Sequence, residues 1–229
     1  MALILAIETS TSVCSVAVHS AGKLISLAEL DQPGVHAEKI MFLVTEALGQ
    51  GRIELKELDA IAVSEGPGSY TGLRIGVSTA KGLAYGLDKP LLGVNTLQSI
   101  ASSVGNSSAD FIIPVLDARR MEVYYQVFDL NHQPLSKLDF EVLKEDSFES
   151  YLSKGKVVFL GDAVDKIRQT ISGPEVEIRG DVHFSASHMG LLALQKFEKE
   201  EFEDIAYFVP NYLKEFKALH SKKNPLLSL

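Results

Sequence analysis

The feature of this chain that most constrains its fold is an order of predicted elements that occurs twice. In the first half, apolar runs and turn signals predict strands at 3–9, 13–19 and 24–30, a helix at 36–48, a strand at 60–64, a helix at 72–87, a strand at 90–94 and a helix at 96–103. In the second half, they predict strands at 112–116, 122–129 and 138–143, a helix at 146–152, a strand at 157–160 and a helix after residue 162. Both halves therefore begin with the order β-β-β-α-β-α, although their sequences show no evident identity.

A duplicated unit of this order predicts an α/β protein with two similar lobes and a cleft between them. This is the plan of the two-lobed actin, Hsp70 and sugar-kinase (ASKHA) superfold. A polar break at 105–108 (GNSS) marks the expected boundary. We expect residues 1–104 to form a first actin-like lobe that carries the dimerisation helices. Residues 105–229 then form a second actin-like lobe, whose last helix can pack back on the first.

The composition predicts a globular protein of a reducing compartment. The apolar fraction is 46% and the charged fraction is 23%, which is ordinary for a globular chain. A single cysteine, Cys14, cannot build a disulfide framework or a cysteine metal site. The N-terminus lacks the pattern of a signal peptide, and no apolar run approaches the roughly 20 residues of a membrane span. We therefore expect a cytoplasmic protein without a membrane partner.

The charge argues against a protein that holds nucleic acid by itself. Acidic residues outnumber basic residues by 30 to 22, and the net charge is −8. A protein that grips nucleic acid usually presents a basic face to the phosphates. The densest basic stretch, at 214–223, is better explained as a solvated helix end. If nucleic acid is bound, we expect another subunit to hold most of it.

Two loops are candidates for a vestigial phosphate site in the cleft. The first β-turn-β of this superfold holds phosphates, and the corresponding turn here, at 8–12, has hydroxyls but no glycine for close approach. Hydrogen bonding of that turn to itself is the simpler interpretation. The loop at 66–71 (GPGSYT) precedes a helix but lacks Walker spacing. The candidate cleft residues are Glu8, Thr9, Ser10, Gly66, Gly68, Asp117 and Arg119.

Two helices of the first half are candidates for an interface. Small residues recur every four positions from Gly72 to Ala84, with a second pair at Gly82 and Gly86. Interior glycine costs a helix about 1 kcal/mol relative to alanine, so a close backbone neighbour is expected, either internal or from a partner. Five consecutive apolar residues at 40–44 exceed the stripe that a surface helix needs. We expect a protein–protein interface formed by Ile40, Leu43, Val44, Ala47, Gly72, Gly76, Ala80, Leu83 and Ala84.

Other site chemistry is poorly supported. His183 and His188 stand five residues apart, and neither lies near a cluster of acids or cysteines, so we expect no metal site. No G-x-S-x-G elbow is present for a serine hydrolase. Asp117, Arg119 and Glu122 form one polar cluster, which either lines the cleft or makes a salt bridge within a turn. We expect no catalytic residue and no cofactor.

Four segments together resemble the TsaB (YeaZ) family. They are IETSTS at 7–12, HAEKI at 36–40, SEGPGSYTGLRIGVSTAKGLA at 64–84 and LDARRMEVYY at 116–125. The resemblance covers roughly the first 130 residues well, and VPNYLKEF at 209–216 also fits. This family supplies a subunit of the bacterial machinery that makes threonylcarbamoyladenosine next to the anticodon of tRNA.

The resemblance implies a scaffold role without catalysis. The paralogous catalytic subunit, TsaD, carries an H-H-M-E-G-H metal motif where this chain has NTLQSI at 95–100, without histidine or carboxylate. The glycine-rich adenosine-binding segments of TsaD are not found either. The family implies pairing with TsaD through the two N-terminal helices, recruitment of TsaE with ATP or ADP, and TsaC as the source of the activated intermediate. It also implies a homodimer when the chain is alone, and tRNA held mainly through the complex.

Two other functions remain open from the sequence. A free-standing actin-like ATPase or small-molecule kinase is favoured by the superfold and by the hydroxyls at 8–12, and disfavoured by the missing glycine and adenosine segments. A hydrolase is disfavoured because no nucleophile and base are arranged for it.

Overall fold

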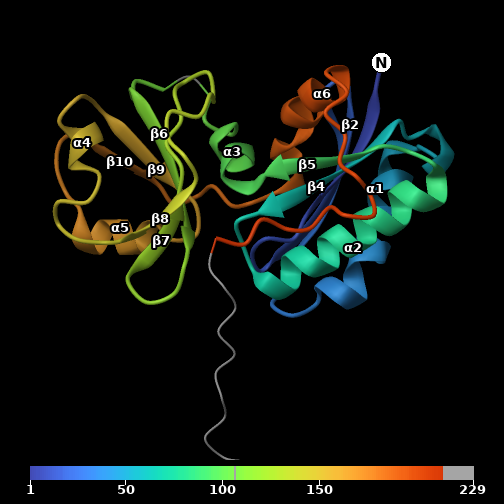
Figure 1. Ribbon diagram of the computed structural model, residues 1–229, viewed down its shortest axis with the longest axis horizontal. Coiled ribbons are helices and arrows are strands. Elements are labelled where there is room, and N and C mark those ends of the chain that lie inside the picture. Colours follow the sequence, from blue (N-terminus) through green and yellow to red (C-terminus); the bar gives the residue numbers. More distant parts are fainter. Residues whose placement is uncertain (106, 214–229) are drawn as a thin grey trace, which may run out of the picture.

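The computed structural model describes residues 1–105 and 107–213 of this 229-residue chain. Figure 1 shows two lobes side by side, each built around its own sheet. The elements of the first half are β1 (Leu3–Glu8), β2 (Val13–Ser20), β3 (Lys23–Asp31), α1 (His36–Gly51), the 3₁₀ turn η1 (Leu55–Glu57), β4 (Ala60–Gly66), α2 (Tyr70–Leu87), β5 (Leu91–Asn95) and α3 (Thr96–Ala101). The strands of this half form a five-stranded sheet in the order β3-β2-β1-β4-β5.

The second half repeats this arrangement with shorter elements. They are β6 (Phe111–Asp117), β7 (Glu122–Tyr125), β8 (Asp139–Val142), α4 (Glu149–Leu152), β9 (Val157–Leu160), α5 (Val164–Thr170), β10 (Val176–Arg179), the 3₁₀ turn η2 (Ala186–His188) and α6 (Gly190–Glu198). The second sheet has the order β10-β9-β6-β7-β8. In each sheet the first strand is central, antiparallel to the second strand and parallel to the fourth. The expected two-lobed actin-like α/β fold is confirmed.

The element predictions differ from the structure mainly in the second half. β9 coincides with the predicted strand at 157–160, but β7 ends at Tyr125, four residues before the predicted end at 129. The chain turns there because Gln126 and Val127 bond to Ser136 through its carbonyl and hydroxyl oxygens. β10 was not predicted from the sequence, and no residue range was predicted for α6. The apolar spacing of LLALQKF in α6 is a helical signal that would have identified that helix.

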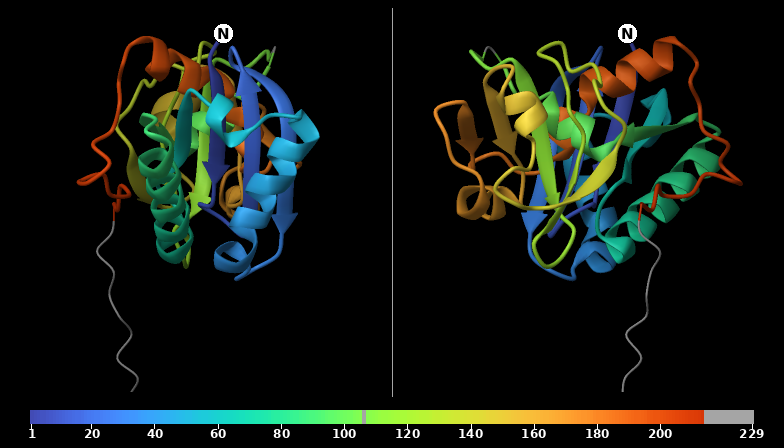
Figure 2. Two further views of the ribbon diagram at one scale, coloured as in Figure 1. Left: turned by 90° about the vertical axis from the view of Figure 1, so that its right-hand side faces the viewer. Right: turned by 60° about the vertical axis from the view of Figure 1, so that its left-hand side comes forward.

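The first sheet is covered on both faces, which explains why β1 and β4 are almost continuously apolar. One face packs against α1 and α2, and Figure 2 shows these two helices side by side on it. The other face packs against η2 and α6 through Ala186, Met189 and Ala193. The segment from 186 onward therefore lies on the first sheet, although it follows the second sheet in the sequence. The predicted domain boundary at 104/105 stays a prediction.

Residues 199–213, here called the C-terminal strap, run along the edge of the first sheet and then beside α2 (Figure 2). The amide of Glu203 donates to the carbonyl oxygen of Leu91 at 2.9 Å, and the amide of Asn211 donates to that of Glu65 at 2.7 Å. Lys81 Nζ donates to the carbonyl oxygens of Ala206 and Phe208, both at 3.1 Å. The strap thus covers the edge of β5. The basic stretch at 214–223 lies outside the described residues.

No helix within residues 1–105 and 107–213 is both long enough and apolar enough to cross a membrane.

Candidate functional site

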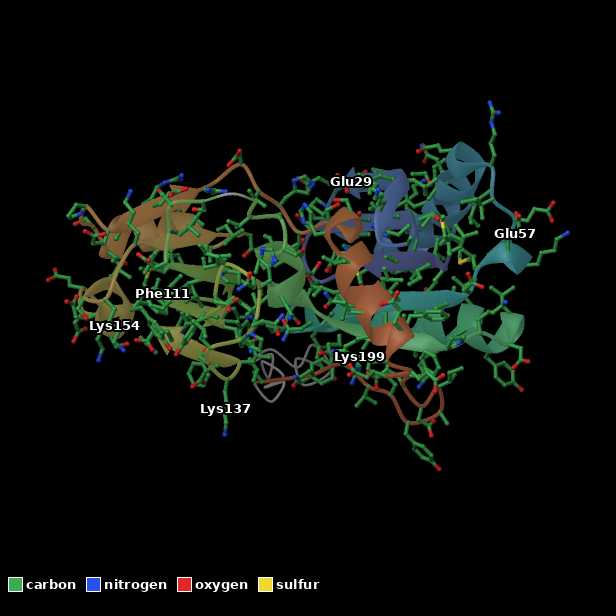
Figure 3. The ribbon with its side chains drawn as sticks, turned by 90° about the horizontal axis from the view of Figure 1, so that it is seen from above. Glu29, Glu57, Phe111, Lys137, Lys154 and Lys199 are labelled. Carbon is green, nitrogen blue, oxygen red and sulfur yellow. The ribbon has the colours of Figure 1, made fainter. Side chains whose placement is uncertain are left out.

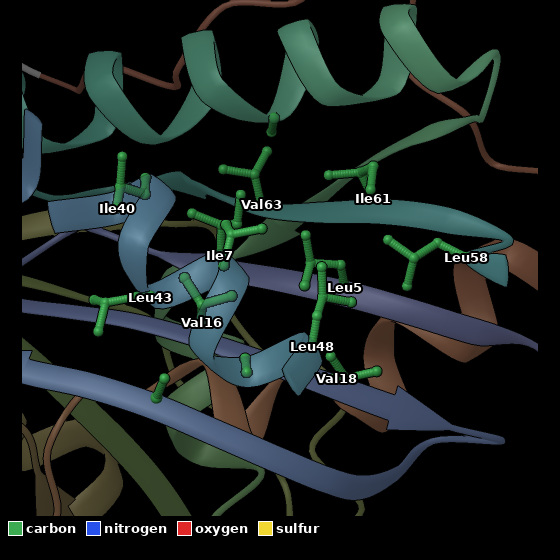
Figure 4. Packing of buried hydrophobic residues seen from close by; sticks show 14 of the residues in the cluster. Leu5, Ile7, Val16, Val18, Ile40, Leu43, Leu48, Leu58, Ile61 and Val63 are labelled. Atoms are coloured by element: carbon green, nitrogen blue, oxygen red, sulfur yellow. The ribbon is translucent and has the colours of Figure 1, made fainter. Parts of the chain in front are cut away.

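The inward face of α1 belongs to the core of the first lobe. Ile40, Leu43, Val44 and Ala47 are each at most 2% exposed. Figure 4 shows Ile40 and Leu43 directed toward the side chains of the sheet. Their spacing is the helical stripe that a helix buries when it covers a sheet.

The small residues of α2 face the turn between β1 and β2. An added Cβ at Gly72 would overlap the carbonyl oxygen of Thr9, and one at Gly76 would overlap the hydroxyl of Thr9. In the loop before α2, an added Cβ at Gly68 would lie only 2.5 Å from the Cβ of Ser10. These glycines therefore allow the start of α2 to lie directly on the β1–β2 turn. Internal packing, rather than a partner, offsets the helical cost of Gly72 and Gly76.

The residues predicted to form the interface lie in or against the core of the first lobe. Of Ile40, Leu43, Val44, Ala47, Gly72, Gly76, Ala80, Leu83 and Ala84, all are buried except Leu83, which is partly buried against the same core. The helical period identified a face of each helix, but that face points toward the sheet. A bulky residue at Gly76 or Ala80 is thus expected to disturb the fold itself.

The outward faces of the same two helices are open. Met41 and Phe42 of α1 are 48% and 60% exposed, and Tyr85 of α2 is 80% exposed. Gly82 and Gly86 have no atom within 4 Å of an added Cβ. These five residues belong to the two helices that lie side by side on one face of the sheet (Figure 2). We call them the outer helix face.

The first residues of the β1–β2 turn are buried, whereas Thr11 is half-buried and Ser12 is exposed. Glu8 and Thr9 are fully buried and Ser10 is 1% exposed. Glu8 Oε1 accepts a 2.6 Å hydrogen bond from the amide of Ser10. Thr9 Oγ1 and Ser10 Oγ have no hydrogen-bond partner within the described part of the chain. Burial outweighs the hydrogen bonds and raises the pKa of the Glu8 carboxyl. The expected self-bonding of the turn is present at Glu8, and at Thr11, whose hydroxyl accepts from the amide of Val13 at 3.3 Å.

A cleft of about 950 Å³ lies between the lobes. It is lined by the loop that starts α2, by the β6–β7 turn and by the end of the strap. Of the predicted cleft residues, Gly68, Asp117 and Arg119 line it, while Ser10 and Asp117 line a smaller adjoining hollow of about 370 Å³. Glu8, Thr9 and Gly66 line neither hollow, because the loop at 66–69 covers the β1–β2 turn.

Asp117 is held by the second lobe. Its Oδ2 lies 2.9 Å from Lys166 Nζ, its Oδ1 accepts from the amide of Arg119 at 2.6 Å, and its own amide donates to Asp162 Oδ1 at 2.9 Å. The salt bridge considered within the turn is therefore replaced by one to Lys166 of α5. Burial raises the pKa of Asp162 to about 6.

A stack of aromatic and cationic side chains forms one wall of the cleft. This stack was not predicted from the sequence. The guanidinium of Arg74 lies 4.0 Å from the ring centroid of Tyr70, and its Nε donates to Tyr212 Oη at 3.2 Å. The ring centroids of Tyr70 and Tyr212 are 4.9 Å apart. This contact joins the start of α2 to the strap.

The segment at 95–100 forms a core helix. Asn95 caps α3, because its Oδ1 accepts from the amide of Gln98 at 3.0 Å. Leu97 and Ile100 are fully buried between the lobes. Within the described residues, no group of three or more histidine, cysteine, aspartate or glutamate side chains is arranged to hold a metal ion.

A polar network on the opposite face of the first sheet was also missed. Glu29, labelled in Figure 3, accepts from His183 Nε2 at 3.0 Å and from the Ser185 hydroxyl at 2.8 Å. Burial alone would raise the pKa of Glu29, but the hydrogen bonds of His183, Ser185 and Ser15 outweigh it and lower that pKa. The network fastens the segment before α6 to β2 and β3, so it is structural in this arrangement.

Comparisons with known proteins support one family. A family model for TsaD, tRNA N6-adenosine threonylcarbamoyltransferase, matches residues 34–225. The tRNA threonylcarbamoyladenosine biosynthesis protein TsaB of Bacillus subtilis is 32% identical over 230 residues, which cover 96% of this chain and 99% of that protein. Escherichia coli TsaB is 39% identical over 123 residues, 53% of each chain. In that alignment, as in the one with the Haemophilus influenzae protein, the match spans about half the length of the relative.

Structural comparison agrees. YeaZ from Pseudomonas aeruginosa superposes with a TM-score of 0.80 at 25% identity, and the match covers 93% of this chain and 100% of that chain. A tRNA N6-adenosine threonylcarbamoyltransferase of Staphylococcus aureus is 32% identical over 199 residues, which cover 76% of this chain and 53% of that enzyme. The fold and the whole length of the chain therefore match one group of proteins, and about half of a larger enzyme matches as well.

Proposed function

The chain belongs to the TsaB (YeaZ) family, and from this premise we propose that it is a non-catalytic subunit of the tRNA threonylcarbamoyladenosine system, which acts by docking onto TsaD. Membership of this family and the match to the TsaD family model support an assignment to a TsaD-containing complex. The scaffold role and the identity of the surface are our proposal. The outer helix face is the observation that carries it.

The outer helix face has the chemistry of a docking surface. Exposed aromatic and methionine side chains are enriched at protein interfaces, and Phe42, Met41 and Tyr85 supply them here. Gly82 and Gly86 leave the C-terminal end of α2 without side chains, so a partner helix can approach its backbone closely. The TsaD family model matches residues 34–225, a range that includes α1 and α2, so a TsaD partner is expected to offer a similar pair of helices.

Two buried segments of the chain argue against catalysis by the subunit alone. In the turn that would contact nucleotide phosphates, Glu8, Thr9 and Ser10 are buried beneath Gly68 and Gly72. The Thr11 hydroxyl accepts from the amide of Val13, and the Ser12 hydroxyl donates to Asp31. The position of the TsaD metal motif is occupied by a buried helix of apolar and uncharged residues at 95–100. The same burial weakens the alternative of a free-standing ATPase or small-molecule kinase, which would need the turn at 8–12 open to its nucleotide.

We extend the proposal to the remaining partners by family. TsaE joins the pair in the presence of ATP or ADP, TsaC supplies the activated threonylcarbamoyl group, and tRNA is held mainly by the complex in the cytoplasm. In the absence of TsaD, two copies of the chain associate through the same outer helix face.

Light scattering after size exclusion tests this proposal, on the chain alone and mixed with TsaD of its own organism. We expect a homodimer that is replaced by a one-to-one heterodimer. Independent elution of the two proteins, even with TsaE and nucleotide present, would contradict docking. Tight Mg-ATP binding by the isolated chain in calorimetry would favour the ATPase or kinase instead.

A further inference from the structure

We propose that the cleft between the lobes contacts a short single-stranded stretch of RNA, with Arg119 and Arg120 on phosphates and the cleft tyrosines against bases. This inference rests on the proposed function, because that function brings an RNA to the complex. It assigns part of the RNA contact to this chain, in addition to what the catalytic partner holds.

The β6–β7 turn presents two arginines in an unusual backbone conformation. Arg119 has φ 70° and Arg120 has φ 46°. Both lie in the left-handed region, which favours glycine or asparagine in such turns. Hydrogen bonds between Ala118 and Glu122, and between Glu122 and Arg119, close the turn. If folding were the only requirement, small residues would be expected at these two positions. The two arginines therefore indicate a role for their guanidinium groups in addition to folding.

The two guanidinium groups are available for a ligand. Both arginines are exposed and line the cleft. Within residues 1–105 and 107–213, neither side chain makes an ion pair or a hydrogen bond, whereas Arg168 and Arg179 pair with nearby acids. The neighbouring Asp117 is already neutralised by Lys166. Planar guanidinium groups without partners suit phosphate oxygens, which they bind through paired hydrogen bonds.

Aromatic rings face the same cleft from three elements. Tyr70 comes from α2, Tyr124 from β7 and Tyr212 from the strap. Arg74 fixes two of them, since its guanidinium stacks on Tyr70 and its Nε donates to Tyr212. Held rings beside cationic groups are the standard platform for unpaired bases, because every base has a face that can stack.

The occupant is a strand of RNA rather than an enclosed mononucleotide. In the turn that would hold a nucleotide triphosphate, Glu8 and Thr9 are fully buried and Ser10 is only 1% exposed. The hydroxyls of Thr11 and Ser12 are already hydrogen-bonded, to the amide of Val13 and to Asp31. The two arginines are exposed in the cleft lining, where they can contact the phosphate backbone of an RNA strand that runs through the cleft. Glu122 also lines the cleft, so the site accepts one or two phosphates and not a duplex. This limited contact agrees with a chain of net charge −8.

The test uses the complex of the full chain with TsaD and a fluorescent single-stranded oligoadenylate RNA, followed by anisotropy at low salt. The variant Arg119→Gln/Arg120→Gln removes both charges. Its matched control is Arg52→Gln, because Arg52 is also exposed, left-handed with φ 53° and without an ion pair within the described residues. Tyr212→Ala removes a ring, and Tyr207→Ala is its control on the same strap outside the cleft lining.

We expect the double arginine variant and Tyr212→Ala each to weaken RNA binding about tenfold or more, and the arginine variant to flatten the salt dependence. Both controls should bind as the unmodified complex does, and AMP or ATP should not compete. Unchanged RNA binding by the variants, or no binding by the unmodified complex, would overturn the inference. Competition by a mononucleotide would overturn it in favour of a nucleotide site. Size exclusion of every variant with TsaD separates these results from a failure of the proposed function, which would appear as lost pairing in the unmodified chain.

Discussion

The two ends of α2 use glycine in opposite ways. Gly72 and Gly76 lie against Thr9, where no Cβ fits. Gly82 and Gly86 stand in open space, with nothing within 4 Å of an added Cβ. Each pair lowers the intrinsic helix stability of α2 by the same amount. Packing within the fold explains the first pair but does not explain the second pair. Under the proposed function, the second pair serves the contact with a partner.

The largest effect is expected from filling the inner space. Gly72→Ala should lower the free energy of unfolding by about 1–3 kcal/mol, because the added methyl group overlaps a backbone carbonyl that cannot rotate away. Thermal unfolding followed by circular dichroism should show a midpoint lower by about 2–4 °C per kcal/mol for a chain of this size. An unchanged or higher midpoint would show that the turn can move, and the distinction between the two glycine pairs would fail.

A large effect on pairing is expected from the outer helix face. Phe42→Ser removes an exposed aromatic ring, and truncation of a central interface residue commonly costs about 2 kcal/mol or more. Calorimetry with TsaD should show binding weakened by a factor of at least about ten. The matched control is Phe140→Ser on β8, which removes a 43% exposed phenylalanine of the second lobe. Equal losses from both variants would argue against this face as the specific surface.

A smaller effect of opposite sign is expected at Gly82. Gly82→Ala should raise the free energy of unfolding by about 0.5–1 kcal/mol, since alanine is the better helix former and the added methyl group meets no atom. Urea denaturation beside Gly72→Ala makes the comparison direct. Destabilisation by both substitutions would mean that α2 is equally constrained along its length.

The subtlest expected effect concerns the buried carboxyl beneath α2. Burial raises the pKa of Glu8, so the folded chain binds more protons than the unfolded chain between pH 4.5 and the folded pKa. The free energy of unfolding contributed by this group therefore falls as the pH rises through that interval. Glu8→Gln should flatten the dependence in urea titrations at several pH values.

Glu29 provides the control for that measurement. Its pKa is lowered, so its contribution to stability is lost only as the pH falls below 4.5. Glu29→Gln should leave the slope above pH 4.5 as it is in the unmodified chain. If the free energy of unfolding of Glu8→Gln depended on pH as it does in the unmodified chain, Glu8 would not be the source of that dependence.

Local patterns were enough to predict the fold but not the direction of its helix faces. The stripe of Ile40, Leu43, Val44 and Ala47 identified a helix and its apolar side, because the period of 3.6 residues is a local property. Whether that side meets a sheet or a partner depends on tertiary packing, and here it meets the sheet. Met41 and Phe42, between the stripe positions, are the residues that remain exposed.

The contacts that shape the cleft could not be predicted for a different reason. Arg74 and Tyr212 are 138 residues apart in the chain, and Glu29 and His183 are 154 apart. No periodicity or spacing rule joins residues at such distances. The sequence did predict Arg119 as a cleft residue. It could not predict the left-handed conformation of the Arg119–Arg120 turn, because two consecutive arginines do not indicate such a conformation.

The most direct test of docking by the outer helix face is the double variant Gly82→Arg/Gly86→Arg, with Gly105→Arg as a control at another open position. Light scattering after size exclusion with TsaD is measured beside the thermal midpoint of each variant. We predict that the double variant keeps a midpoint at or above that of the unmodified chain and forms no heterodimer, while the control pairs normally. A double variant that folds and still forms the one-to-one complex would contradict the account.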